Sequence, residues 1–294
     1  MITNKNIQQH HHHLLSKKII IIFMLSILFI IGLSSEILSQ NYDKDFTTAQ
    51  KLYDKAIGYK SIGKNQEEML QLFEEVSSIY LNLIEKENIN NAYLYYNLAN
   101  CYYNMGQIGE SIYYYKIAKQ LKPEFRDINK NLLEARSNVD TYIENKEKDS
   151  IIKVLFFWHY QTSIQTKLII AIVLFTLVWI ILGVNLLFFR QRIFIGLGLA
   201  SLVVSIVFFV SIFTQFINDK NQWWGVVTSN QGVNAKIGPG ENYASRFDQK
   251  LSEGVEFEVI EEKDEWMKIK LDNNEVCWIA KSSTHILQNS VLFK

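Results

Sequence analysis

Two long apolar segments stand next to each other in the middle of the chain, at residues 168–189 and 193–217. Neither contains a charged residue, and only Arg190, Gln191 and Arg192 separate them. A helix rises about 1.5 Å per residue and needs roughly 20 apolar residues to cross the hydrocarbon of a bilayer, so each segment is long enough to span a membrane. The short connection predicts a helical hairpin, which places the residues before and after it on the same side.

The charges around these segments indicate which side the hairpin tip faces. Arg190 and Arg192 at the tip are not balanced by an acidic residue. The far ends are mixed, with Lys167 before the first segment and Asp219 after the second. Positive charge near short loops marks the cytoplasmic side of a membrane. We therefore expect the tip, residues 190–192, in the cytoplasm and both flanking regions outside.

Aromatic and small residues agree with a pair of membrane helices. Aromatic residues at 158–160 and 223–224 flank the two segments, where amphipathic rings favour the headgroup layer. Small residues four apart in the second segment permit close packing against the first, or simply reflect how common small residues are in membrane helices. They are Gly196, Ala200, Ser201 and Ser205.

The first 40 residues have the pattern of an export signal. Lys17 and Lys18 precede an apolar stretch at 19–33, and small residues follow it. Such a segment is either cleaved, here near Ser39 and Gln40, or kept as an uncleaved anchor. Both alternatives place the region that follows it outside.

Residues 43–144 show helical periodicity, which is clearest at 92–123. Large residues alternate there with small ones at positions where two helices must approach closely, and a glycine and a proline mark the turn and the end. The large ones are Tyr95, Leu98, Tyr102 and Tyr115, the small ones Ala99, Ser111 and Ala118, and the markers Gly106 and Pro123. This stretch resembles a tetratricopeptide (TPR) repeat, a pair of antiparallel helices of about 34 residues.

One repeat cannot bury its own faces, so neighbouring helices are expected. Apolar residues at helical spacing over 46–57 and 69–84 predict a divergent helical pair, interrupted by a polar insert at 60–68. The spacing over 125–143 predicts a capping helix. A charged linker and an interfacial segment then fill residues 145–167.

The TPR resemblance implies a peptide-binding concave face on the first helix of the repeat. Asparagine amides can bond to a peptide backbone, and tyrosines add rigid apolar area with a polar tip. We expect the asparagine side chains to point to solvent in the free protein. The alternative to peptide binding is that they are ordinary polar surface residues. The residues on this face would be Tyr93, Tyr96, Asn97, Asn100 and Tyr103.

From residue 225 to 287 the pattern changes to alternation with turns between short segments, which is typical of strands. The motifs at 233–240, 265–269 and 277–279 resemble those of bacterial SH3 domains, which are small barrels. The resemblance implies binding of a cell-wall peptide or a protein segment without catalysis. Trp266 and Trp278 are candidates to line a groove, although tryptophans in a small barrel more often belong to the core.

Composition and motifs favour binding over catalysis. The chain has 30 basic and 30 acidic residues, so its charge gives no argument for nucleic acid. Cys101 and Cys277 lie in different predicted domains and in apolar patterns, which predicts buried free thiols. The sequence contains none of the common hydrolase, zinc or phosphate-loop motifs, so we expect no enzyme, no cofactor and no metal site.

The sequence therefore predicts a multi-domain membrane protein: an all-α TPR helical repeat, a transmembrane helical hairpin and a C-terminal all-β SH3-like barrel. This order resembles the BatE-type proteins of the Bat aerotolerance operons. The resemblance implies an inner-membrane protein with its TPR and SH3 domains in the periplasm. Its partners would be other Bat proteins, with von Willebrand A-type or TPR domains, alongside a MoxR-type ATPase.

Two functions from different classes of binding protein remain open at this stage. The first is a membrane-tethered scaffold for protein interactions in the cell envelope, in which two binding modules on one side gain from effective concentration. The alternative is an envelope anchor or sensor whose SH3 domain binds peptidoglycan or wall peptides.

Overall fold

The structure, a computed structural model, describes residues 44–62, 65–85, 89–140, 156–186, 191–221 and 223–288. The predicted signal and most of the predicted linker lie outside the described residues, as does Arg190 of the hairpin tip. The chain divides into two compact units, which are treated separately below. One contains Ile164–Gln215, and the other contains Tyr42–Ser163 together with Phe216–Lys294.

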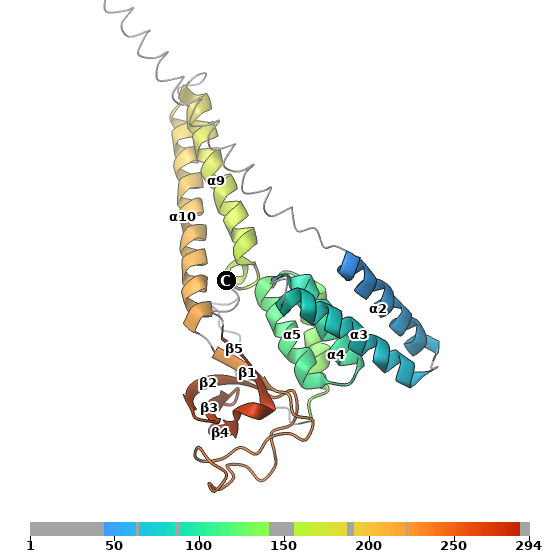
Figure 1. The fold of residues 1–294 in the computed structure, drawn as a ribbon. Coiled ribbons are helices and arrows are strands. Elements are labelled where there is room, and N and C mark those ends of the chain that lie inside the picture. The colour runs from blue at the N-terminus through green and yellow to red at the C-terminus, as the bar shows by residue number, and fades with distance from the viewer. Residues whose placement is uncertain are drawn as a thin grey trace, which may run out of the picture. The chain divides into compact units, whose positions relative to one another are not determined.

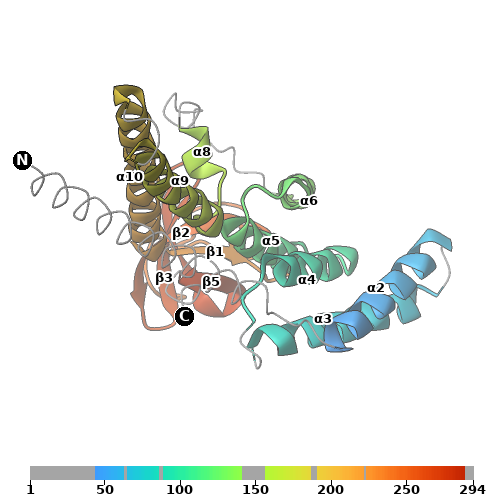
Figure 2. The ribbon, with the colours of Figure 1, turned by 90° about the horizontal axis from the view of Figure 1, so that it is seen from above.

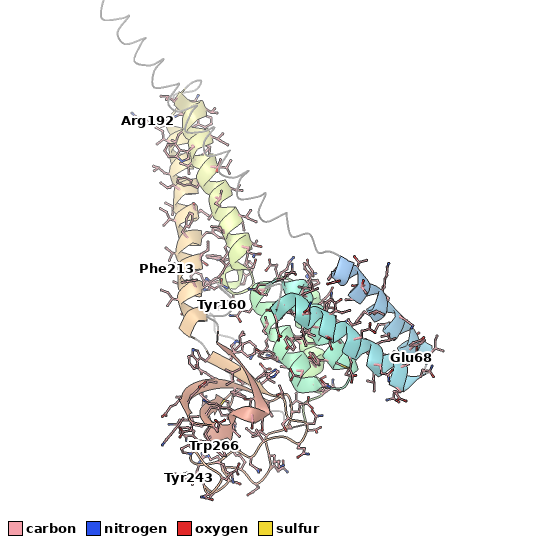
Figure 3. All side chains as sticks on the ribbon, in the orientation of Figure 1. Glu68, Tyr160, Arg192, Phe213, Tyr243 and Trp266 are labelled. Atoms are coloured by element: carbon pink, nitrogen blue, oxygen red, sulfur yellow. The ribbon has the colours of Figure 1, made fainter. Side chains whose placement is uncertain are left out.

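The first unit consists of two long apolar helices that run side by side, α9 (Ile164–Val184) and α10 (Arg192–Asn221) (Figure 1). Figure 3 labels Arg192 near the start of α10 and Phe213 towards its other end. The mean hydropathy reaches 2.7 in α9 and 2.8 in α10, and both helices are long enough to cross a membrane. The prediction of two apolar helices of spanning length is therefore confirmed.

The start of α9 differs from the prediction, which placed Lys167 outside the helix. The helix begins at Ile164, so Lys167 lies in its first turn and is fully buried. The Lys167 ammonium donates a hydrogen bond to the side-chain oxygen of Gln215 on α10. This polar contact between the helices explains why a charged residue can be accommodated there.

Two serines of α10 hold the helices together. The Ser201 hydroxyl donates to the Leu174 carbonyl oxygen at 2.9 Å, and the Ser205 hydroxyl donates to the Ala171 carbonyl oxygen at 3.0 Å. Small polar residues of this kind let membrane helices approach closely and bond across the interface. The predicted role of these two serines is confirmed.

The prediction of close packing against α9 is wrong for the other pair of small residues, Gly196 and Ala200. Gly196 has nothing within 4 Å of the position its Cβ would take, and Ala200 is exposed. Gly198, two residues further on, makes the contact instead, because a Cβ there would lie 3.2 Å from the Leu182 side chain.

The second unit begins with a run of helices in which α2 to α6 each pack on the next, as Figure 2 shows for α4 and α5. They are α2 (Lys44–Ile62), α3 (Gln66–Glu85), α4 (Ala92–Asn104), α5 (Ile108–Leu121), α6 (Arg126–Ser137) and the short α8 (Phe157–Tyr160). The polar insert predicted at 60–68 is mostly helical, since only three residues separate α2 from α3.

The α4–α5 pair has the predicted packing. Ala99, Ser111 and Ala118 are fully buried at the positions where small residues were expected, and Tyr115 is 1% exposed among them. Gly106 joins the two helices with φ +78°, a conformation that favours glycine.

Helix α6 is shorter than predicted. It ends at Ser137, and Val139 leaves the helical path to pack on the core of the C-terminal sheet. A Cβ atom added to Gly254 would lie only 2.6 Å from a methyl carbon of Val139. A contact with a residue so far along the chain overrides the local helical spacing.

The C-terminal part is a five-stranded antiparallel sheet of order β4-β3-β2-β1-β5. The strands are β1 (Trp223–Val227), β2 (Glu256–Lys263), β3 (Trp266–Leu271), β4 (Val276–Ala280) and β5 (Thr284–Gln288). Alternate residues point into one core, which contains Phe257, Met267, Ile269, Leu271, Cys277 and Ile279. The segment between β1 and β2 is irregular and is held by bridges from Val233 to Leu251 and from Lys236 to Trp278. The motif at 233–240 therefore lies in a loop.

Candidate functional site

Helices α4 and α6 share a polar surface centred on Asn100. The Asn100 side-chain oxygen accepts a hydrogen bond from the Tyr115 hydroxyl at 2.5 Å and one from Asn131 Nδ2 at 3.1 Å. Asn131 Nδ2 also donates to the Tyr96 hydroxyl at 3.1 Å. The expectation that Asn100 points to solvent is therefore wrong, because its amide connects three helices.

The same surface continues towards the end of both helices. The Tyr103 hydroxyl donates to Glu134 Oε1 at 2.9 Å and accepts a hydrogen bond from Asn138 Nδ2 at 3.3 Å. Burial, followed by the neighbouring Glu134 carboxylate, raises the pKa of Tyr103. The hydroxyl therefore stays protonated at neutral pH and remains a donor. We call this surface the α4–α6 polar face, formed by Tyr96, Asn100, Tyr103, Asn131, Glu134 and Asn138, and we count with it Asn97, the next residue of α4 after Tyr96, on the α3 side.

The remaining candidates from α4 differ in their access to solvent. Asn97 is half-buried, and its side chain lies beside the buried Tyr80 hydroxyl of α3. Tyr93 is 43% exposed, and its hydroxyl accepts a hydrogen bond from Lys122 Nζ at 2.7 Å. Tyr93 also stacks edge-on against Phe125, whose ring in turn contacts Tyr96.

Asn131 is a member of this face that the sequence reasoning missed. It stands 34 residues after Asn97, which is one repeat length further along the chain. Applying the period to the capping helix would have found it. Its side-chain oxygen can still accept a hydrogen bond, since the bonds described above use only the amide nitrogen.

The two candidate tryptophans of the sheet point away from its core. Trp266 and Trp278 are half-buried, whereas their neighbours Met267 and Cys277 are buried inside. Trp278 is paired with Lys268 and not with Trp266, so the two rings are diagonal neighbours on one outer face. The expectation that they belong to the core is wrong. Figure 3 shows Trp266 and Tyr243 on this part of the chain.

Charged groups join the helices and the sheet of the second unit. Glu256 of β2 accepts hydrogen bonds from Arg136 of α6 at 2.6 and 2.9 Å, and Lys116 of α5 lies 2.7 Å from the same carboxylate. Burial alone would raise the pKa of Glu256, but the charge of Lys116 and the hydrogen bonds of Arg136 outweigh it and lower the pKa to about 2. The carboxylate is therefore ionised throughout the physiological range.

The N-terminus of α5 is capped from the sheet side. The helix has no capping side chain of its own at Gln107, and the Gly109 amide donates to Glu253 Oε1 at 2.8 Å instead. A carboxylate at this position compensates the unpaired amides and the positive end of the helix dipole.

Aromatic residues pack around the same junction. The Trp224 ring of β1 lies 5.6 Å from the Tyr113 ring, and Lys116 Nζ stands 4.0 Å from the Trp224 ring centre. The Trp224 ring therefore packs on α5, and its position in the headgroup layer stays a prediction. Of the aromatic residues predicted to flank α9, Tyr160 is 49% exposed.

The cysteines are buried free thiols, as predicted. Burial raises the pKa of Cys101, and burial also raises the pKa of Cys277 to about 12, so neither forms the thiolate that a nucleophile needs. Within the described residues, no three His, Cys, Asp or Glu side chains gather where they could hold a metal ion. The chain matches no protein-family model and no curated protein.

Proposed function

We propose that this protein is a membrane-tethered scaffold for protein interactions. One observation supports it above the others: α5 and α6, which precede the apolar hairpin, pack on β1 and β2, which follow it. The Glu256 contacts with Lys116 and Arg136 need both parts in the same compartment. An even number of membrane crossings between them meets that requirement, as a hairpin does.

The finer assignments belong to the same proposal. Helices α2–α6 would form a TPR-like repeat with α6 as its cap, and the sheet would be an SH3-like domain. Arg192 at the start of α10, with no acidic residue beside it in the sequence, supports a cytoplasmic tip. The second unit would then lie outside, in the periplasm if the membrane is a bacterial inner membrane. Similarity to BatE-type proteins would make Bat proteins with von Willebrand A-type or TPR domains the partners.

The α4–α6 polar face is the proposed partner-binding surface of the helices. Its internal hydrogen bonds fix Asn100 and Asn131 in place before a ligand arrives, which lowers the entropy cost of binding. Asn97, the free oxygen of Asn131 and the Tyr103 hydroxyl are then the groups that could bond to a peptide backbone.

Pull-down from detergent-solubilised membranes tests this function. We expect Asn97→Ala with Tyr103→Phe to weaken partner capture about ten-fold, since each lost hydrogen bond contributes roughly 0.5–1.5 kcal/mol. The matched control is Gln50→Ala with Tyr59→Phe on α2, which removes the same groups elsewhere. Equal capture by both double variants would exclude the α4–α6 polar face as the binding surface.

A second candidate function is anchoring to the cell wall. The observation that favours it is the outward position of Trp266 and Trp278, since aromatic rings on a surface can stack on sugars and peptides. Sedimentation of the purified full chain with purified wall, lost on Trp278→Ala, would support the anchor over the scaffold.

A further inference from the structure

The outer face of β3 and β4 has an ordered row of charges around one tryptophan. Lys268 pairs with Trp278 across the β3–β4 register, and Lys236 pairs with Trp278 on its other side. The Lys236–Trp278 bridge is formed by two backbone hydrogen bonds of 2.7 and 2.8 Å. Residues paired in antiparallel register point to the same face, so the two lysines flank the Trp278 ring.

These lysines are not neutralised within the described part of the chain. Lys236 and Lys268 form no ion pair there, and neither does Lys263, which pairs in register with Trp266. Nearby lysines behave differently, since Lys270 lies 4.0 Å from Glu258 and Lys281 lies 2.8 Å from Glu262. The register also places Glu261 of β2 opposite Lys268, on the side away from Trp278, but no ion pair joins the two within the described residues. The charges of Lys236 and Lys268 beside Trp278 therefore stay available to a ligand.

We propose that this face, formed by Lys236, Lys268, Trp266 and Trp278, binds an acidic, extended segment of a partner protein. Neighbouring strands are about 4.8 Å apart, so the backbones at Lys236 and Lys268 are separated by about 10 Å. An extended chain rises about 3.3 Å per residue and alternate side chains point to the same side, so two acids separated by one residue lie about 7 Å apart on one side. Lysine side chains are long enough to reach both. Both carboxylates can then meet a lysine while the backbone between them covers the Trp278 ring.

The inference rests on the proposed role of the chain as an interaction protein, but it concerns a different surface from the α4–α6 polar face. Anisotropy titration of the full chain in nonionic micelles tests it, with a fluorescein-labelled peptide of about twelve residues that has glutamate at every second position. We expect binding that weakens with added salt and fails for the same peptide with glutamine in place of glutamate.

Two variants locate the site. Lys236→Gln with Lys268→Gln should weaken peptide binding about five- to ten-fold, and Trp278→Ala should do so with little change in melting temperature, because its side chain lies outside the core. Lys51→Gln with Lys130→Gln removes the same charge from α2 and α6 and should bind as the wild type does. Asn97→Ala with Tyr103→Phe should also bind normally, which separates this result from the test of the helices.

Three results would overturn the inference. The peptide could fail to bind the wild-type chain, the two lysine double variants could lose equal affinity, or the glutamine peptide could bind as well as the acidic one. Sedimentation with purified cell wall through Lys236 and Lys268, in the absence of peptide binding, would assign the face to the wall and reject a protein partner.

Discussion

Two glycines allow the helices and the sheet of the second unit to approach each other closely. A Cβ on Gly109 of α5 would stand 2.4 Å from the carbonyl oxygen of Val227 in β1, which is backbone and cannot move aside cheaply. Gly254 meets Val139 in the same junction and has φ +87°, which side chains other than glycine rarely adopt. The helices and the sheet can therefore pack this closely only because neither position has a side chain.

Replacing Gly109 by alanine should destabilise the protein even though alanine is the better helix former. The clash with the Val227 carbonyl should destabilise the folded state by more than the roughly 1 kcal/mol that alanine gains over glycine in helix propensity. Gly58 in α2 provides the matched control, since nothing lies within 4 Å of its Cβ position, and Gly58→Ala should stabilise by about 0.4–1 kcal/mol. Thermal unfolding of the two variants measures this, and a raised melting temperature for Gly109→Ala would contradict the packing described.

His285 gives the junction a dependence on pH. Its Nδ1 lies 2.9 Å from the Glu110 carboxylate, and the hydrogen bond to Glu110, which outweighs burial, raises the pKa of His285. Glu253 and Tyr113 face the same site. Because the pKa of His285 is raised, the stability that the His285–Glu110 pair contributes is complete below about pH 6.5, the ordinary pKa of histidine. It is lost as the pH rises through the raised pKa.

Comparison of the wild type with His285→Gln isolates this effect, because both contain Glu110 and Glu253. The melting temperature of the wild type should exceed that of the variant by more at pH 5.5 than at pH 8. The imidazole is partly exposed, so the gain should stay below about 1 kcal/mol. A difference that is the same at both pH values would show that the pair does not form.

At the scale of elements, helix α5 is the centre of the second unit. Its first turn is capped by Glu253, its middle holds Trp224 and Glu256 through Lys116, and its small residues Ser111 and Ala118 pack in the helical core. One helix thus belongs to both parts, which couples the stability of the repeat to that of the sheet.

Two substitutions of Glu253 separate the contribution of its hydrogen bond to α5 from that of its negative charge. Glu253→Ala removes the bond to the Gly109 amide and should cost about 1 kcal/mol, as the loss of an N-cap does. Glu253→Gln keeps an acceptor and loses only the attraction to the helix dipole, so it should cost less. Chemical unfolding measures both values. Equal costs, or none, would mean that Glu253 is not the cap.

Elements with local signals could be predicted from the sequence. The α4–α5 pair follows from the spacing of Ala99, Ser111 and Ala118, and the apolar helices from length and hydropathy alone. The end of α6 could not be found, because Val139 leaves the helix for a contact with Gly254. The positions of Trp224 and Asn100 also depend on partners that lie far along the chain or on another helix, and periodicity contains no information about them.

At the scale of the whole molecule, the contacts of the second unit constrain the path of the chain. Helices before α9 and strands after α10 share one packed unit, with Glu256 bonded across it. Glu256 is ionised and contacts the charged groups of Lys116 and Arg136, so these contacts could not form with the helices and the sheet on opposite sides of a bilayer. The account therefore requires that α9 and α10 return the chain to the side from which it entered.

Thiol labelling of intact cells with a reagent that cannot cross the inner membrane tests that requirement most directly. Single cysteines in place of Lys130, Glu265 and Gln191 report on α6, the sheet and the hairpin tip, and all three positions are exposed. The buried Cys101 and Cys277 should give little background, which the unaltered chain measures. We predict labelling of Lys130→Cys and Glu265→Cys, and of Gln191→Cys only after the membrane is permeabilised. Labelling of Lys130→Cys and Glu265→Cys from opposite sides would contradict the account.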